Sequence, residues 1–169
     1  MNRREILEAG NPRLYLDLDG VMADFDAHFP SVFGLDHKSM ADDAMWERIN
    51  SHESYFLDMP PCPGAVEFFG DISFLKPIIL TACPKSNYAH VAQQKRQWVH
   101  RHLCPSLTVL PVMGGRNKWL FMHQPGDLLI DDFAKNLVPW TKAGGVSLLH
   151  TDFATTSCEL SLWVAGALE

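Results

Sequence analysis

Residues 14–25 read LYLDLDGVMADF. The first three residues are apolar and predict a buried strand over about residues 13–18. Asp17 and Asp19 stand where that strand ends, and residues two apart in an extended chain point to the same side. Two carboxylates on one side repel each other unless a cation lies between them or one takes a proton. The pair therefore predicts a metal-binding site that carries out chemistry, with a strand and a plain Asp-Gly turn as the alternative.

The composition is that of an ordinary globular protein. The chain has 169 residues, of which 47% are hydrophobic and 20% are charged, and this length predicts one domain with a sizeable core. The net charge is −6 and no run of lysines or arginines occurs, which argues against binding duplex nucleic acid through its phosphates. A small anionic substrate needs a local positive centre instead.

The chain lacks the sequence signals of membrane insertion and export. No apolar run approaches the ~20 residues that span a bilayer, and the charged N-terminus is not followed by the apolar segment of a secretory signal. The four cysteines lie far apart and form no C-x-x-C pair. We therefore expect reduced thiols and a cytoplasmic protein that does not contact a membrane.

Short apolar runs alternate with helical patterns after residue 60. This alternation predicts an α/β fold with a five-stranded, mainly parallel sheet and helices on both of its faces. Further strands are expected over 76–81, 107–111, 127–132 and 146–149, and helices over 65–74, 86–103, 118–123, 136–142 and 161–168.

A different pattern occupies residues 24–60. Aromatic and other apolar residues recur there at helical spacing among polar ones, which predicts two or three short helices. The proline-rich stretch 60–64 is a rigid break. We therefore expect a catalytic core formed by residues 1–23 and 61–169, with a small helical cap inserted at 24–60.

Polar residues follow three of the predicted strands. Thr81 ends the strand over 76–81, and Asp131 and Asp132 end the strand over 127–132. In a parallel sheet the carboxyl ends of the strands share one edge, and ligands bind there at the point where the strand order reverses. We therefore expect these side chains to meet Asp17 and Asp19.

These residues, taken in chain order, resemble the motifs of the haloacid dehalogenase (HAD) superfamily of phosphohydrolases. The resemblance covers about residues 13–150 and rests on Asp17-Leu18-Asp19-Gly20-Val21, Thr81, Lys118 and Asp131-Asp132. Three stretches are also similar to the 5'(3')-deoxyribonucleotidase family, namely DLDGVMADF at 17–25, residues 80–103 with Lys95 and Trp98-Val99, and DLLIDD at 127–132. The resemblance implies a Rossmann-like HAD fold with a small helical cap after the first strand.

The resemblance also implies a role for each motif residue. Asp17 is expected to attack phosphorus and form an aspartyl phosphate, and Asp19 to protonate the leaving oxygen and later take a proton from water. Crowding by Asp17 is expected to favour the protonated form of Asp19. Thr81 and Ala82 are expected to bind phosphoryl oxygens. Lys118 is the preferred phosphate-binding lysine, and Lys95 on the helix over 86–103 is its rival.

The acidic residues are expected to hold Mg²⁺. Asp131 or Asp132 would bind the ion together with Asp17 and the main-chain carbonyl of Asp19, and this all-oxygen donor set suits Mg²⁺ better than zinc. Asp127 begins the apolar strand and is therefore expected at the opposite end of the sheet.

The expected substrate is a small phosphate ester, most simply a nucleoside monophosphate. Phe25, Phe29, Trp46 and Phe56 of the cap are candidates for stacking on a nucleobase, with a role in the core of the cap as the alternative. A sugar or other metabolite phosphate is a second candidate substrate, and a catalytically silent binding domain is a third interpretation. The sequence leaves open the base preference, the choice of 5' or 3' phosphate and the oligomeric state, a homodimer included.

Overall fold

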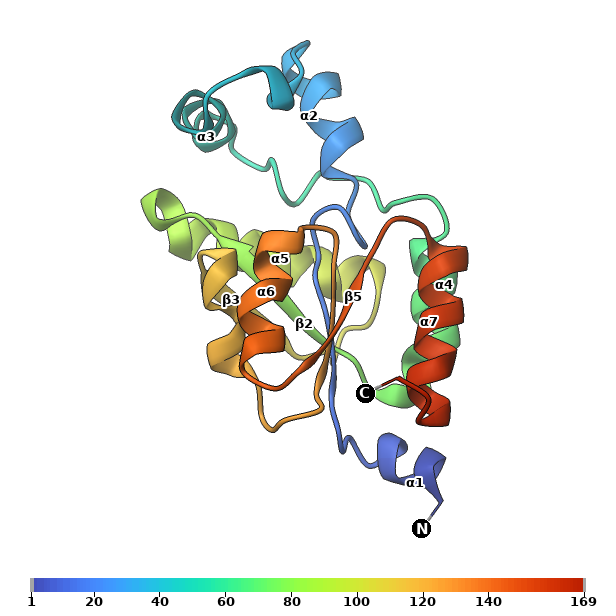
Figure 1. Ribbon diagram of the computed structural model, residues 1–169. Helices are drawn as coiled ribbons and strands as arrows, with labels where there is room; N and C mark the ends of the chain where they lie inside the picture. The colour runs from blue at the N-terminus through green and yellow to red at the C-terminus, as the bar shows by residue number, and fades with distance from the viewer. Residues whose placement is uncertain (1, 169) are drawn as a thin grey trace.

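The computed structural model describes residues 2–168, which form one five-stranded sheet and its flanking helices (Figure 1). The strand order is β3-β2-β1-β4-β5, and every neighbouring pair is parallel, which confirms the expected parallel α/β sheet. The strands are β1 (Leu14–Leu16), β2 (Ile78–Cys83), β3 (Val109–Met113), β4 (Leu128–Asp131) and β5 (Val146–Leu149). The α-helices are α1 (Arg3–Glu8), α2 (Phe25–Phe33), α3 (Asp42–Ser51), α4 (Ala65–Ile72), α5 (Tyr88–His102), α6 (Ala134–Lys142) and α7 (Phe153–Ala165), and the 3-10 helices are η1 (His37–Ser39), η2 (Ser73–Leu75), η3 (Lys85–Asn87) and η4 (Gly115–Phe121).

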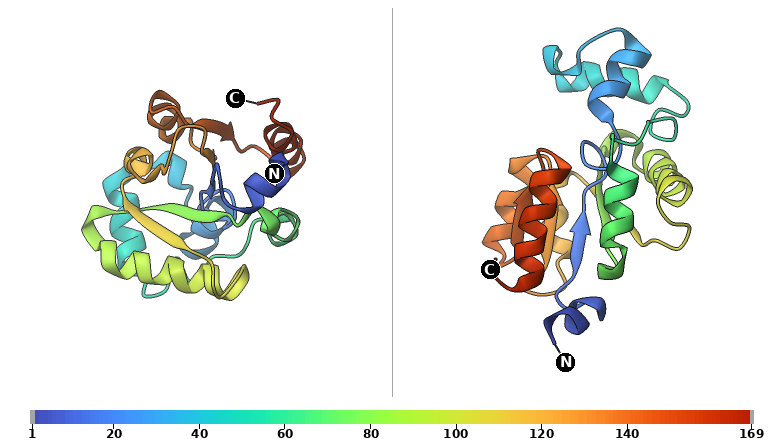
Figure 2. Two further views of the ribbon diagram at one scale, coloured as in Figure 1. Left: turned by 90° about the horizontal axis from the view of Figure 1, so that it is seen from below. Right: turned by 90° about the vertical axis from the view of Figure 1, so that its right-hand side faces the viewer.

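Helices cover both faces of the sheet, as expected (Figure 2). Alternate residues of a strand point to opposite faces, so Leu14 and Leu16 of β1 join one core and Tyr15 joins the other. The larger core contains buried residues of α1, α4, α5 and α7, whereas the smaller core contains those of α6. The central strand is therefore buried on both sides, which accounts for its unbroken apolar run.

The strand order reverses beside β1. The chain passes from β1 to β2 and β3 on one side, and then to β4 and β5 on the other. The carboxyl ends of β1 and β4 are therefore neighbours at the position where open α/β sheets bind their ligands. Figure 1 shows the segment 24–60, with α2 and α3, lying beyond these strand ends.

Two adjacent chain segments connect residues 24–60, which we call the cap, to the sheet. The amide of Asp24 donates to the carbonyl of Pro60 over 2.8 Å, and the amide of Cys62 donates to the carbonyl of Met22 over 2.8 Å. The Asp24 side chain also accepts from the amide of Ala27 and caps α2. The cap thus departs directly from the end of the β1 motif.

Several elements differ from the sequence expectation. β2 runs over Ile78–Cys83 rather than 76–81, and the segment expected as a helix over 118–123 belongs to the 3-10 helix η4, which begins at Gly115. β3 runs over Val109–Met113 rather than 107–111, because Pro111 is tolerated inside a strand at the edge of the sheet, where its missing N–H breaks no ladder bond. α7 begins at Phe153 rather than residue 161, because the Asp152 side chain accepts from the amide of Thr155 and caps the helix. The apolar periodicity of α7 starts later than the helix itself.

Within residues 2–168, none of the helices is both long enough and apolar enough to cross a membrane.

Candidate active site

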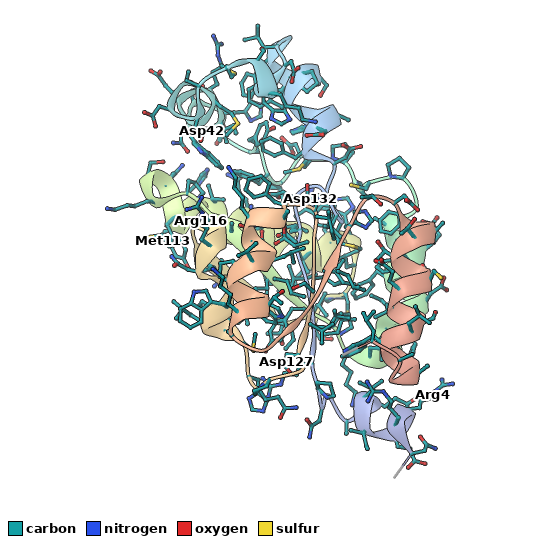
Figure 3. All side chains as sticks on the ribbon, viewed as in Figure 1. Arg4, Asp42, Met113, Arg116, Asp127 and Asp132 are labelled. Carbon is teal, nitrogen blue, oxygen red and sulfur yellow. The ribbon has the colours of Figure 1, made fainter. Side chains whose placement is uncertain are left out.

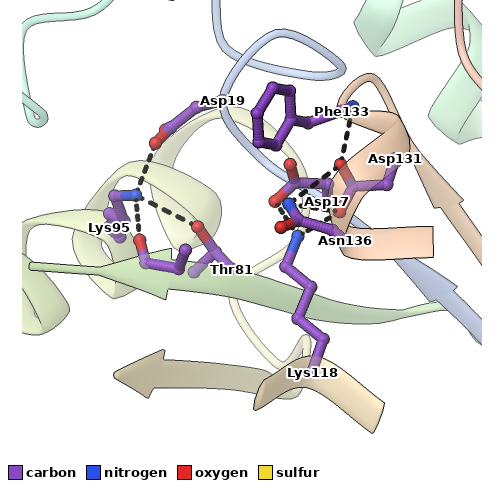
Figure 4. A network of polar contacts seen from close by, with 9 residues as sticks. Asp17, Asp19, Thr81, Lys95, Lys118, Asp131, Phe133 and Asn136 are labelled. Atoms are coloured by element: carbon purple, nitrogen blue, oxygen red, sulfur yellow. Dashed lines mark hydrogen bonds and ion pairs between the residues drawn. The ribbon is translucent and has the colours of Figure 1, made fainter. Parts of the chain in front are cut away.

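Asp17 and Asp131 lie side by side at the ends of β1 and β4 (Figure 4). The amide of Asp17 donates to the carbonyl of Ile130 over 2.9 Å, so the pairing of the two strands continues up to the site. Lys118 of η4 bridges the two carboxylates, with its Nζ 2.7 Å from Oδ1 of Asp17 and 2.5 Å from Oδ2 of Asp131. The structure thus brings Lys118 to the predicted nucleophile.

Asp131 is enclosed by hydrogen-bond donors. Its Oδ1 accepts from the amide of Phe133 over 2.9 Å, and the side-chain amide of Asn136 lies 3.2 Å from both carboxylate oxygens. Asn136 in turn packs against Gly115, where any side chain would collide with the Asn136 amide. Sequence reasoning missed Asn136, although its position in the first turn of α6, five residues after Asp131, was a signal for it.

Asp132 has a different environment from its neighbour. The residue is exposed, and its carboxylate lies against Gly20, which has a φ of 77° and no room for a Cβ beside the Asp132 oxygens. Asp17, Asp131 and Asp132 each offer a carboxylate oxygen, and these oxygens lie within 4.8 Å of one another. Three converging carboxylates fit a hard divalent cation such as Mg²⁺. Since donors already occupy both Asp131 oxygens, Asp132 is the more available ligand.

The pKa values of these groups reflect their burial and mutual repulsion. Burial, followed by the charge of Asp131, raises the pKa of Asp17 well above its usual range, although Lys118 opposes the rise. Desolvation, followed by the charges of Asp131 and Asp19, raises the pKa of Asp132 to about 7. Burial alone would lower the pKa of Lys118, but Asp17 and Asp131 raise it overall. This accumulation of negative charge favours a bound cation.

Asp19 has its own cationic partner (Figure 4). Nζ of Lys95 on α5 lies 2.6 Å from Oδ2 of Asp19, and it also contacts Oγ1 of Thr81 at 3.1 Å and the carbonyl of Ala82 at 2.6 Å. The sequence predicted that Asp17 and Asp19 would crowd each other. In the structure, Lys118 holds Asp17 and Lys95 holds Asp19, so each carboxylate has a separate cationic partner.

A cavity of about 1230 Å³ opens between the strand ends and the cap. Among the predicted site residues, those that line it are Asp17, Asp19, Phe25, Trp46, Ala82 and Asp132. Thr81, Lys95 and Lys118 lie beneath its floor and are buried. Figure 3 shows Asp132 on the side of the cap and Asp127 at the opposite end of the sheet, where Asp127 accepts from the amides of Arg13, His123 and Gln124.

The four aromatic candidates occupy two kinds of position. Phe25 and Trp46 are half-buried and line the cavity. Phe29 and Phe56 are buried and do not line it; both pack against Tyr55 in the interior of the cap. The structure therefore offers Phe25 and Trp46 to a ligand in the cavity.

The chain is similar in sequence to known proteins. A family model described as "5' nucleotidase, deoxy (Pyrimidine), cytosolic type C protein" matches residues 37–155. A Bordetella pertussis protein described as "Putative 5'(3')-deoxyribonucleotidase" is 30% identical over 139 residues, which cover 70% of this chain and 73% of that protein. The human "5'(3')-deoxyribonucleotidase, cytosolic type" is 28% identical over 148 residues, covering 73% of this chain and 72% of that one.

Among solved structures, a hydrolase from Streptococcus pneumoniae TIGR4 has a similar fold. Its TM-score is 0.50 at 12% sequence identity, and the match covers 88% of this chain and 97% of that chain. At this identity the similarity concerns the fold alone.

Proposed function

Because the chain belongs to the family of 5' nucleotidase, deoxy (Pyrimidine), cytosolic type C proteins, we propose that it hydrolyses (deoxy)nucleoside monophosphates to a nucleoside and phosphate. The observation that carries the proposal is the pairing of Asp17 with Lys118 and of Asp19 with Lys95 beneath one cavity. This arrangement keeps a nucleophile and a proton donor as separate groups, as phosphate ester hydrolysis requires.

Asp17 is the proposed nucleophile. Its carboxylate oxygen attacks phosphorus while the bond between phosphorus and the sugar oxygen breaks, and Asp19 gives its proton to that departing oxygen. Asp19 then takes a proton from water, which attacks phosphorus and releases Asp17. Ala82, which lines the cavity, is the proposed contact for phosphoryl oxygens, whereas the buried hydroxyl of Thr81 contacts Lys95.

Asp17, Asp132 and the main-chain carbonyl of Asp19 are the proposed ligands of Mg²⁺. Carboxylate and carbonyl oxygens are the donors that this ion prefers. When bound, the ion offsets the repulsion between the Asp17 carboxylate and the negatively charged phosphate. Asp131 holds Lys118 in place and supports the site from below.

The cap is the proposed site of substrate selection. Trp46 and Phe25 line the cavity on the cap side, and aromatic side chains can stack on any nucleobase. We also propose a cytoplasmic location, because the family description and the human relative are of the cytosolic type and the four cysteines are free thiols, as in a reducing compartment.

A substrate panel tests the proposed function. Deoxynucleoside monophosphates should be hydrolysed with a higher kcat/KM than glucose 6-phosphate. Trp46→Ala should lower kcat/KM for the nucleotides by roughly 5- to 100-fold, because stacking contributes about 1–3 kcal/mol per base. The same variant should leave kcat/KM for glucose 6-phosphate unchanged. Trp119→Ala, which removes an exposed tryptophan outside the cavity, is the matched control. Equal kcat/KM values across the panel would favour a general metabolite phosphatase.

The Mg²⁺ requirement should depend on pH. Protons compete with the ion for Asp132, whose pKa is about 7, so the half-saturating Mg²⁺ concentration should fall roughly tenfold per pH unit up to about pH 7 and then level off. Titrations of activity with Mg²⁺ from about pH 5.5 to about pH 8 give this measurement. In Asp132→Asn the requirement should rise and its pH dependence should become weaker, leaving the part that is due to Asp17, whose pKa is also raised. A constant Mg²⁺ requirement in the unaltered protein would contradict the assignment.

A further inference from the structure

Lys95 has no hydrogen left for a phosphate. An ammonium group carries three N–H donors, and Nζ of Lys95 already contacts Oδ2 of Asp19, Oγ1 of Thr81 and the carbonyl of Ala82, at 2.6, 3.1 and 2.6 Å. The side chain is 1% exposed and does not line the cavity. A phosphoryl oxygen could reach this ammonium only if one of the three contacts were broken.

The cap segment also immobilises Lys95. The ring of Phe56 lies 4.6 Å from Nζ, in the geometry of a cation–π contact. The neighbouring Gln94 accepts from the amide of Phe56 over 3.0 Å, which attaches this part of the cap to α5. The ammonium is therefore held from both sides, by the strand end and by the cap.

The two oxygens of Asp19 are not equivalent. Lys95 occupies Oδ2, whereas Oδ1 is shielded from solvent and has no hydrogen-bond partner among residues 2–168. A buried oxygen without a partner is unfavourable, so the contact between Oδ2 and the Lys95 ammonium is the one that holds this carboxyl group in place.

We propose that Lys95 is a positioning residue for Asp19 and not a phosphate ligand. The proposal rests on the phosphate ester hydrolysis proposed above. As the bond between phosphorus and the leaving oxygen breaks, its electron pair takes the proton from the Asp19 carboxyl group. The negative charge that remains on Asp19 spreads to Oδ2, where the Lys95 ammonium already lies. The charge that develops in the transition state thus meets a preorganised cation.

The leaving group separates this role from the alternatives. A nucleoside leaves as an alcohol and needs the proton, whereas p-nitrophenolate departs without one. Lys95→Met should lower the rate of the first step, measured as pre-steady-state release of nucleoside from a deoxynucleoside monophosphate, by roughly 10- to 100-fold, part of the 10²–10⁴-fold that a general acid contributes. For p-nitrophenyl phosphate, the pre-steady-state release of p-nitrophenolate should change by less than about 3-fold. The steady-state kcat of either substrate also includes the attack of water, in which Asp19 takes a proton, so only the first step separates the two leaving groups. KM and inhibition by inorganic phosphate should stay unchanged.

Asp19→Asn provides the matched comparison. It should give the same dependence of the first step on the leaving group, and the double variant should be no slower on the nucleotide than Asp19→Asn alone, because both changes disable one unit. Lys95→Gln, whose shorter polar side chain fits the same space, should show the same dependence of the first step on the leaving group. Thermal unfolding of each variant verifies its fold.

Three results would overturn the proposal. A higher KM for both substrates, with weaker inhibition by phosphate, would make Lys95 a phosphate ligand. An equal loss in the rate of the first step on both substrates would make its role merely structural. If the unaltered protein hydrolysed neither substrate in Mg²⁺, the proposed function itself would fail, and this inference with it.

Discussion

Asp17→Asn should lose hydrolysis of deoxynucleoside monophosphates by roughly 10⁴-fold or more while remaining folded. The asparagine amide cannot form the covalent bond to phosphorus, and no other carboxylate in residues 2–168 takes the place between Lys118 and the end of β1. Steady-state kinetics in Mg²⁺ with a deoxynucleoside monophosphate gives the loss. Asp71→Asn, which alters an exposed carboxylate of α4 outside the site, should keep normal kcat and KM.

The stability of Asp17→Asn distinguishes lost chemistry from lost structure. Burial and Asp131 raise the pKa of Asp17, so in the absence of Mg²⁺ the folded protein binds a proton that the unfolded chain releases. The stability that this group contributes is therefore lost as the pH rises from the ordinary pKa of an aspartate through the raised pKa of the folded state. A neutral amide removes that penalty. The melting temperature of Asp17→Asn at about pH 8 should therefore equal or exceed that of the unaltered protein. An inactive variant with a much lower melting temperature would contradict this account.

Lys118→Met should lower both stability and activity. Lys118 is fully buried and contacts two buried carboxylates, so its removal leaves Asp17 and Asp131 without their cation. Breaking a buried ion pair in this way costs about 3–5 kcal/mol. Urea unfolding in the absence of Mg²⁺ measures the loss, and kcat for a nucleotide should fall at least about 100-fold, as when one preorganised charge is removed.

The loss of stability in Lys118→Met should shrink as pH falls. At acidic pH the carboxyl of Asp17, whose pKa is raised, takes a proton and no longer needs the ammonium. Lys142→Met, which alters an exposed lysine of α6, should change the free energy of unfolding by less than about 0.5 kcal/mol. A Lys118→Met protein as stable as its parent at basic pH would show that the carboxylates have another partner.

Much of the fold follows from local patterns. The strand at 146–149 and the helix around 88–102 occur where the apolar periodicity places them, because side-chain burial repeats with the period of the element. The extension of β3 past Pro111 and the early start of α7 depend instead on an edge position for Pro111 and on a cap at Asp152. Neither the edge nor the cap changes the hydrophobic pattern.

The candidate site likewise contains residues that the sequence predicts and residues that depend on the tertiary structure. The residues at the strand ends are predictable, because the carboxyl ends of parallel strands meet at one edge. Asn136 is harder to find, since its role depends on how α6 packs beside Asp131. The burial of Phe29 and Phe56, compared with the partial exposure of Phe25 and Trp46, depends on which way each short cap helix faces.

The sequence by itself determined the family, the parallel sheet and the residue types that gather at its carboxyl edge, because these depend on motifs and on periodicity within single elements. Only the tertiary structure decided which lysine serves which carboxylate. Lys95 lies 76 positions from Asp19, and Lys118 lies 13 positions from Asp131, so the packing of α5 and η4 against the sheet determines both pairings. Sequence order ranks the two lysines as rivals for one phosphate, whereas packing gives each of them a different aspartate.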